Sequence, residues 1–257
     1  MQRCTMAGLR RPFFVLSVLS VFAAVVDAQT PPPKPDEPPP RLEANGQFTL
    51  LATTGNASAT SIGAAGDLIA RSDPWTYTAK AAFAQTEDDE EVSARSFLGL
   101  FRAARAISPR LSLYGQYDYL RDLFAGIEHR QTIDGGLSYL LVDRAPHRLR
   151  LDGSVGYLYE SRVNNEDFDS AIATLGGGYE LRISETSTFT DDARIILTFA
   201  DAGAWKFEQI AALTAALNTI FSLKLSNTIR YSNEPVPGFE RTDTITSVAI
   251  VARIRRP

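Results

Sequence analysis

Apolar and polar residues alternate along much of this chain, most clearly between Leu149 and Glu160. In that stretch the odd positions are apolar, small or aromatic, whereas most even positions are polar. Successive side chains of a β-strand point to opposite faces, so the stretch predicts one strand of about twelve residues with an apolar and a charged face. Tyr157 and Tyr159 lie at one end of the apolar face, which favours contact with lipid, because tyrosine rings prefer the headgroup level of a bilayer.

The same alternation recurs in most of the segments between proline, glycine and acidic breaks. Pro74, Pro109 and Pro146 fall in three of these breaks, as expected for a residue that has no backbone donor. The pattern predicts strands over residues 46–53, 57–71, 75–86, 92–106, 110–121, 128–142, 147–160, 170–183, 187–200, 205–217, 220–232 and 241–254. Most of these strands exceed the roughly five or six residues that are common in soluble sheets.

Long amphipathic strands in an even number favour an all-β fold, a closed antiparallel transmembrane β-barrel of about 12 strands. Lipid offers no hydrogen-bond partner to the backbone, so strands can span it only when they close into a ring without an edge. The breaks alternate between short turns, expected in the periplasm, and longer extracellular loops. Strand 92–106 fits least well, because Leu98 and Leu100 would face the lumen. A soluble secreted β-barrel that binds a small ligand is the alternative, and it predicts shorter strands.

The N-terminal region has the features of a secretory signal peptide, predicted over residues 1–28. Arginines without an acid precede an apolar run over residues 12–26, and small residues precede the expected cleavage after Ala28. The run is shorter than the ~20 residues that span a bilayer as a helix. The only cysteine, Cys4, lies inside this segment, so the mature chain is expected to have no disulfide.

A proline-rich segment follows, with seven prolines in residues 30–40. Proline holds φ near the polyproline value, so residues 29–45 are predicted to be a stiff periplasmic tether before a barrel domain at 46–257. A periplasmic protein that binds the tether is a weaker alternative. The expected location is the outer membrane of a Gram-negative bacterium, with the tether in the periplasm.

The formal net charge of −4 gives no reason to expect binding to nucleic acid. Charged residues on the inward parity are the main candidates for function, and they carry both signs. They are Lys80, Arg102, Asp118, Asp134, Arg150, Asp152, Glu180, Arg182, Asp192, Arg194, Lys224 and Arg230. Mixed charges predict paired networks, which could line a narrow passive pore or plug a barrel with a structural role in envelope stress.

Residues for catalysis are sparse, so no enzymatic activity, metal or cofactor is predicted. Of the two histidines, His129 lies on the outward parity, with Gln131 and not a serine two residues along. An outer-membrane lipid-modifying enzyme, which would need a serine beside such a histidine, is the alternative function. The candidate loop residues are predicted to fold inward as a constriction or to pack on the rim. They are Arg121, Asp122, Phe124 and Gly126.

Four segments carry a resemblance to a known family. They are T-T-G-N-A-S from Thr53, Y-L-R-D-L-F-A-G-I-E-H-R from Tyr119, G-Y-L-Y-E from Gly156 and S-N-E-P-V-P-G-F-E-R-T-D-T from Ser232. The chain resembles the bacterial family of salt-induced outer-membrane proteins, domain of unknown function 481, from about Gln47 to Ile254.

The resemblance implies a barrel in the outer membrane, surrounded by lipid and lipopolysaccharide and inserted by the barrel-assembly machinery. It implies no activity and no catalytic residue. Family members tend to end on an aromatic residue, whereas Ile254 takes that place here.

Overall fold

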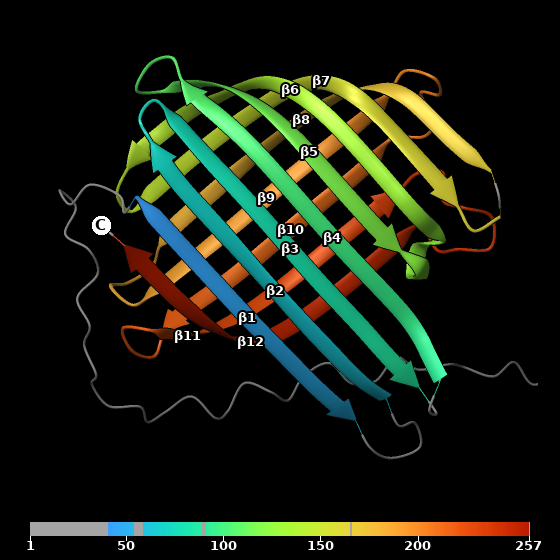
Figure 1. The fold of residues 1–257 in the computed structure, drawn as a ribbon, viewed down its shortest axis with the longest axis horizontal. Coiled ribbons are helices and arrows are strands. Elements are labelled where there is room, and N and C mark those ends of the chain that lie inside the picture. Colours follow the sequence, from blue (N-terminus) through green and yellow to red (C-terminus); the bar gives the residue numbers. More distant parts are fainter. Residues whose placement is uncertain (1–40, 54–58, 89–90, 165, 257) are drawn as a thin grey trace, which may run out of the picture.

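The chain forms a closed antiparallel β-barrel in a computed structural model, which describes residues 41–53, 59–88, 91–164 and 166–256 (Figure 1). The elements are β1 (Leu42–Thr53), β2 (Ala59–Ser72), β3 (Trp75–Asp88), β4 (Glu91–Ala106), β5 (Leu111–Asp122), η1 (Leu123–Ala125), β6 (Ile127–Arg144), β7 (His147–Arg162), β8 (Asp167–Arg182), β9 (Ser187–Thr198), β10 (Lys206–Ala216), β11 (Phe221–Ser232) and β12 (Thr242–Arg256). Each strand pairs with its neighbours in sequence, and β1 pairs with β12 to close the ring. The predicted fold class, with twelve strands, is confirmed within these residues.

Several strands extend beyond their predicted ends. β1 begins at Leu42, inside the segment 29–45 that was predicted to be tether. Leu42 pairs with both Ala70 and Arg256, so backbone partners on both sides continue the strand past the end of the alternating pattern. The predicted signal peptide and the proline-rich run lie outside the described residues.

The two ends of the barrel differ in their connections, and we call them the turn end and the loop end. The turn end carries the short connections, such as Asp73-Pro74 between β2 and β3 and Ala145-Pro146 between β6 and β7. At the loop end, residues 199–205 join β9 to β10 and residues 233–241 join β11 to β12. The long loop predicted after the seventh strand is shorter than expected, because β7 continues to Arg162 and β8 begins at Asp167.

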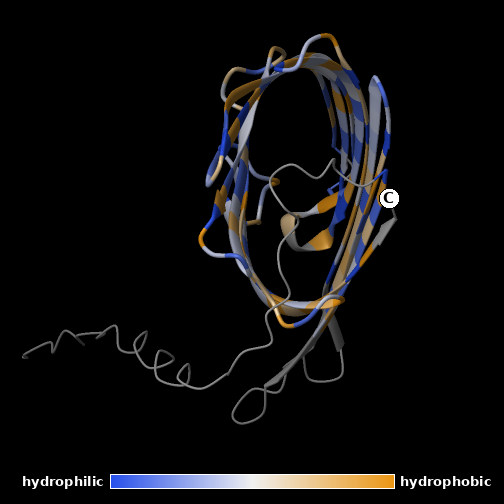
Figure 2. Cartoon of the chain, turned by 90° about the vertical axis from the view of Figure 1, so that its left-hand side faces the viewer, coloured by the Kyte–Doolittle hydropathy of each residue, from blue (hydrophilic) through white to orange (hydrophobic). Residues whose placement is uncertain are grey.

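The outer surface of the barrel is apolar. Ile133, Val155 and Leu175 are 63%, 67% and 59% exposed. On β7, Leu151, Val155 and Tyr157 are all exposed, whereas the alternate residue Leu158 is fully buried. Hydropathy alternates along the strands of the ring in Figure 2, which views the barrel from its turn end. No helix in the described ranges is long and apolar enough to cross a membrane.

The inner side of the barrel is not uniformly polar. Leu158, Ile172 and Ile196 form a buried cluster on β7, β8 and β9, with Phe168 packed against it. On β4, Leu98 and Leu100 face inward as predicted, because they pair on the inner face with Leu120 and Asp118. Apolar groups therefore share the lumen with the charged groups described below.

Candidate functional site: the charged lumen

The predicted lumen residues lie on one face of the pleated sheet, the face that encloses the lumen. Cross-strand rows link them: Arg194 pairs with Glu208, and Glu208 pairs with Arg230. Because directly paired residues share a face, each row has a single orientation. Contacts that cross the lumen fix that orientation as inward.

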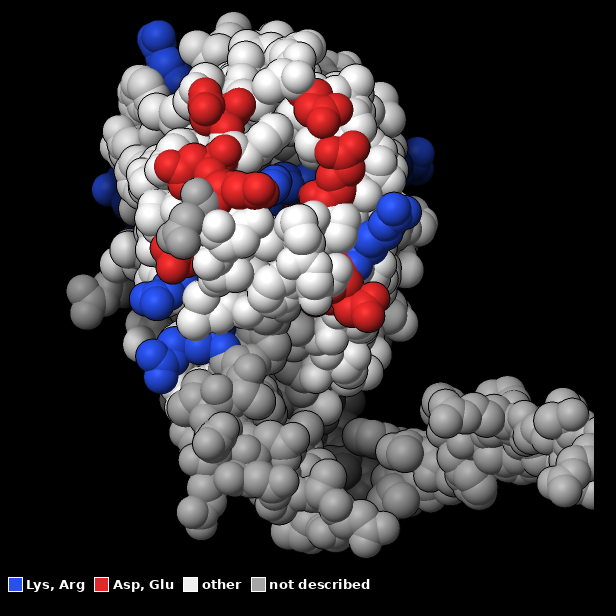
Figure 3. Space-filling model, turned by 90° about the vertical axis from the view of Figure 1, so that its right-hand side faces the viewer, with Lys and Arg blue, Asp and Glu red and all other residues white. Residues whose placement is uncertain are grey.

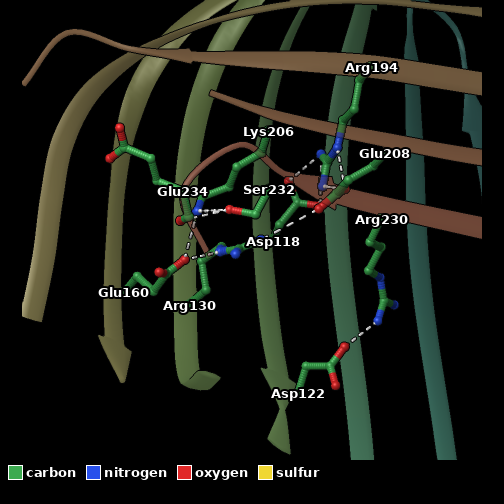
Figure 4. A network of polar contacts seen from close by, with 10 residues as sticks. All are labelled: Asp118, Asp122, Arg130, Glu160, Arg194, Lys206, Glu208, Arg230, Ser232 and Glu234. Carbon is green, nitrogen blue, oxygen red and sulfur yellow. Dashed lines mark hydrogen bonds and ion pairs between the residues drawn. The ribbon is translucent and has the colours of Figure 1, made fainter. Parts of the chain in front are cut away.

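Glu160 on β7 is the centre of a buried ion network near the loop end (Figure 4). Its carboxylate is 1% exposed and accepts hydrogen bonds from Arg130 Nε at 2.7 Å and Arg162 Nε at 2.8 Å. Lys206 Nζ, on a side chain that is 3% exposed, lies 3.4 Å from the same carboxylate. A buried charge is costly unless it is paired, so these cations and Glu160 depend on one another.

Glu208 extends the network toward the opposite wall. Its carboxylate lies 2.7 Å from Arg194 Nη2 and 3.6 Å from Arg130 Nη1. Arg194 in turn reaches Asp118 on β5, with 3.4 Å between Nη1 and Oδ2. Strands β9 and β5 are four positions apart in the ring, so this contact crosses the lumen.

A second contact ties opposite sides of the barrel together. Arg230 on β11 donates a hydrogen bond of 2.6 Å from Nη1 to Oδ2 of Asp122 on β5 (Figure 4). These strands are six positions apart in a ring of twelve, which is the largest separation that such a ring allows. The lumen is therefore narrow at this level.

A separate cluster occupies the lumen nearer the turn end. Arg102 Nη2 lies 3.1 Å from Asp152 Oδ1, and its guanidinium stacks on the Tyr114 ring at 3.6 Å. Arg150 reaches Asp152 at 2.9 Å and Asp192 at 3.2 Å. The Arg150 and Asp192 side chains are 43% and 54% exposed, so solvent reaches this part of the lumen.

The other candidates are placed less closely together. Asp134 is buried, and its Oδ1 has no hydrogen-bond partner among the described residues. Glu180 and Arg182 form an exposed pair, 3.6 Å apart, at the turn end. Lys80 and Lys224 join neither cluster and make no ion pair with a described carboxylate; Lys224 Nζ donates to Gln47 Oε1 at 3.4 Å.

The four loop candidates separate in the structure. Asp122 points into the lumen toward Arg230, whereas Arg121 is exposed on the outward parity. Gly126 has a φ of +70°, and a Cβ added there would lie 2.6 Å from the Phe239 ring. The loops 123–126 and 233–241 therefore pack against each other. The side chain of Phe124 lies outside the described residues.

A small cavity lies beneath these loops. A cavity of about 30 Å³ is lined by Asp122, Arg130, Lys206, Arg230 and Val236, among others. That volume holds one or two waters. Figure 3 views the loop end and shows carboxylates around its mouth, with basic side chains between them.

The sequence did not identify the centre of the network. Glu160 has the same parity as Asp152, so extending the alternation to the end of β7 would have included it. Lys206 and Glu208 were harder to find, because Gln209 and Ile210 break the alternation on β10. Asp122, predicted as a loop residue, is the last residue of β5.

The histidines do not form a catalytic arrangement. His129 contacts Tyr159 in a tilted arrangement, with 5.9 Å between the ring centroids, and pairs across strands with Ser161. Position 131, two residues after His129, holds a glutamine, but Ser161 on the neighbouring strand lies beside His129. No hydrogen bond joins the Ser161 hydroxyl to the His129 imidazole. His147 Nδ1 lies 2.7 Å from the Tyr179 hydroxyl. Within the described ranges, no group of three or more His, Cys, Asp and Glu side chains could hold a metal ion.

A family model matches residues 46–254, which is most of the chain. The chain belongs to the DUF481 family. The family is described as proteins of unknown function, so membership assigns no activity. A curated relative, the uncharacterized protein YdiY of Escherichia coli (strain K12), is 22% identical over 212 residues, covering 81% of this chain and 82% of YdiY.

Solved structures of two porins and of an autotransporter translocator domain are similar to this DUF481 chain. The NanC porin covers 84% of this chain and 99% of its own, with a TM-score of 0.45 and 10% identity. The KdgM porin covers 84% and 99%, with a TM-score of 0.41 and 7% identity. The translocator domain of the autotransporter NalP from Neisseria meningitidis covers 86% and 90%, with a TM-score of 0.43 and 11% identity. The closed barrel of this DUF481 chain is established by its own strand pairing, and the family assigns it no activity.

Proposed function

We propose that this protein is a narrow passive pore of the outer membrane, constricted near its loop end by the cross-lumen ion pairs. In this arrangement the loop end faces outward and the turn end faces the periplasm, as is usual for outer-membrane barrels. Small ions and polar solutes would pass between the charged clusters, and nothing in the proposal requires catalysis.

The observation that carries the proposal is the exposure of charged groups inside the lumen. Arg150 and Asp192 are about half exposed although both face inward, so water reaches them from the turn end. In pores that are wide enough for ions to pass, rings of charged side chains set the ion selectivity. The Arg230–Asp122 pair would then be the narrowest point, because it joins strands on opposite sides of the ring.

Planar-bilayer conductance of the refolded protein tests this function. We expect discrete openings of small conductance, larger openings after the double change Asp122→Asn with Arg230→Gln, and altered ion selectivity after Arg150→Ala. Arg105→Gln, on the outward parity, is the matched control and should conduct as the unmodified protein does. A protein that stays silent in all variants would contradict the pore.

A structural barrel with a role in envelope stress is the second candidate. The small cavity beneath the loops favours it, because a space for one or two waters is too small to hold a polar solute at this level. In that case neither the unmodified protein nor any of these variants would conduct. Deletion of the gene would instead weaken the envelope, and Asp122→Asn with Arg230→Gln would restore it less well than the unmodified chain.

A further inference from the structure

Polar side chains on three neighbouring strands interrupt the apolar outer surface of the barrel. They are Asp191 on β9, Gln209 on β10 and Asn227 on β11, and these strands lie side by side in the ring (Figure 1). Each is an odd number of positions from a lumen-facing charged residue of its own strand, so each points outward. Asn227 pairs across strands with Thr246 on β12. We call these four residues the outer polar patch.

The three strands that carry most of the patch have apolar outward residues on both sides of it. The strands have 12, 11 and 12 residues, close to the roughly 9–11 that a tilted strand needs to cross a bilayer. The flanking outward residues are Phe189 and Ile195 on β9, Phe207 and Leu213 on β10, and Leu225 and Ile229 on β11. Of these, Leu213 and Leu225 are 42% and 47% exposed. The patch therefore lies within the band that faces hydrocarbon.

Elsewhere on the strands that the structure describes, outward-facing acidic, amide and basic side chains occur only toward strand ends. Gln131 and Asp169, for example, are separated from the loop end only by the outward residues His129 and Asp167. Side chains at strand ends reach the polar head groups. Lipid tails offer no hydrogen-bond partner to the outer polar patch, so a carboxylate and two amides at this depth indicate a surface that is covered by protein.

The patch uses only part of its hydrogen-bonding capacity within the chain. Gln209 Nε2 donates to Asp191 Oδ1 at 2.9 Å, and Asn227 Nδ2 donates to Thr246 Oγ1 at 2.9 Å. A primary amide has two N–H groups and an acceptor oxygen, and a carboxylate has two acceptor oxygens. No other described residue bonds these amides or this carboxylate. The patch thus presents donors and acceptors together, which makes it complementary to a second patch of the same kind.

The arrangement of the patch fits two-fold symmetry. Ala211 lies between Asp191 and Asn227 in one cross-strand row, and Ala193 lies beside Gln209. Small side chains allow the walls of two membrane proteins to approach closely. In a symmetric dimer the same patch serves both subunits, so an axis beside Ala211 would set the β9 side of one copy against the β11 side of the other. Each carboxylate would then face an amide.

We propose that the outer face of β9 to β11 is the interface of a homodimer in the outer membrane, formed by the outer polar patches of two copies of this chain. The dimer goes beyond the proposed pore, because each copy keeps its own lumen and association can be measured whether or not the barrel conducts.

Cross-linking at Ala211 tests the interface. In a Cys4→Ala background, Ala211→Cys places one thiol beside the proposed axis. Ala81→Cys is the matched control on the outer face of β3, five positions from β10 in the ring. Both are refolded into vesicles of phosphatidylethanolamine and phosphatidylglycerol at a low ratio of protein to lipid. Oxidation, or a short bis-maleimide, should join Ala211→Cys chains in pairs and leave Ala81→Cys chains single.

Replacement of the patch by leucine tests its hydrogen bonds. Asp191→Leu with Gln209→Leu and Asn227→Leu keeps a surface that suits lipid, so the variant should fold as well as the unmodified protein, as its gel mobility before heating reports. In sedimentation in non-ionic detergent, its association constant should be lower by about tenfold or more, because several hydrogen bonds between the copies are lost. Gln131→Leu, which removes an outward amide near the loop end of β6, should associate normally.

Three results would overturn the dimer. The first is equal cross-linking of Ala211→Cys and Ala81→Cys. The second is equal association of the leucine variant and the unmodified protein, including the case in which both sediment as single barrels. The third is a cross-link in intact cells that joins position 211 to a different protein and not to a second copy.

Discussion

The two sides of this lumen are stabilised in different ways. From β5 to β11 the inner face carries buried cations and carboxylates that pair within a strand, between neighbours and across the barrel. From β12 through β1 to β3 the inner face is mixed: small residues such as Ala65 and Ala82 lie beside Asp67 and the Arg71–Glu43 pair. The ion pairs of β5 to β11 include two that cross the lumen, whereas the Arg71–Glu43 pair joins neighbouring strands. We call the first region the braced half and the second the mixed half.

The largest effect is expected at Glu160. Glu160→Ala leaves Arg130, Arg162 and Lys206 without their shared carboxylate, and breaking a buried ion pair from one side costs about 3–5 kcal/mol. Urea unfolding of the barrel in detergent measures the loss. Ala82→Ser on the inner face of β3 is the matched control, for which we expect less than about 0.5 kcal/mol. Equal losses for the two changes would abolish the distinction between the halves.

Val155→Arg should have the next largest effect. Val155 is 67% exposed on the outer face of β7, and arginine on the lipid face near the bilayer midplane costs about 2–4 kcal/mol. The comparison is Thr228→Arg, which places the same side chain on the inner face. The fraction of each variant that folds into vesicles, measured by its gel mobility, distinguishes the two. A barrel that tolerates Val155→Arg as well as Thr228→Arg does not meet lipid with its outer face.

Gly126→Ala should loosen the loops over the braced half. The added methyl group would meet the Phe239 ring, and a φ of +70° disfavours any L side chain, so we expect a loss of about 1–3 kcal/mol. Gly238→Ala is the control, because Gly238 has a φ of +90° but open space around it. Proteolysis of the folded barrel at the loop end should increase more for Gly126→Ala. The same rate for both variants would show that the contact with Phe239 is unimportant.

The smallest effect is expected at the turn end. Arg182→Ala breaks an exposed pair with Glu180, and such pairs contribute about 0–1 kcal/mol. Urea unfolding should detect little change at any salt concentration. A loss as large as that for Glu160→Ala would show that the brace extends along the whole lumen.

The sequence predicted the fold because its signal is repeated in most strands. A two-residue period determines which face meets lipid, and proline and acidic breaks set the turns. Leu98 and Leu100 were correctly placed in the lumen by parity alone, although they seemed to be exceptions. They lie on the inner face, where they pair with Ala82 and Lys80 of β3.

The contacts of the site could not be predicted in the same way. Parity indicates that Arg194 and Arg230 face inward, but the partner of each depends on the register and on the shape of the ring. Asp122 illustrates this limit, because the pattern ended its strand one residue early and assigned it to a loop.

The pair between Arg230 and Asp122 also constrains the order in which the barrel can be assembled. Its members are 108 residues apart, on the fifth and eleventh strands. If strands join the sheet in sequence, the strand that carries Asp122 is in place well before the strand that carries Arg230. The contact can then form only when the ring is almost complete. Formation of this ion pair therefore marks a late stage, at which the ring of strands closes. Contacts of such long sequence separation are slow to form.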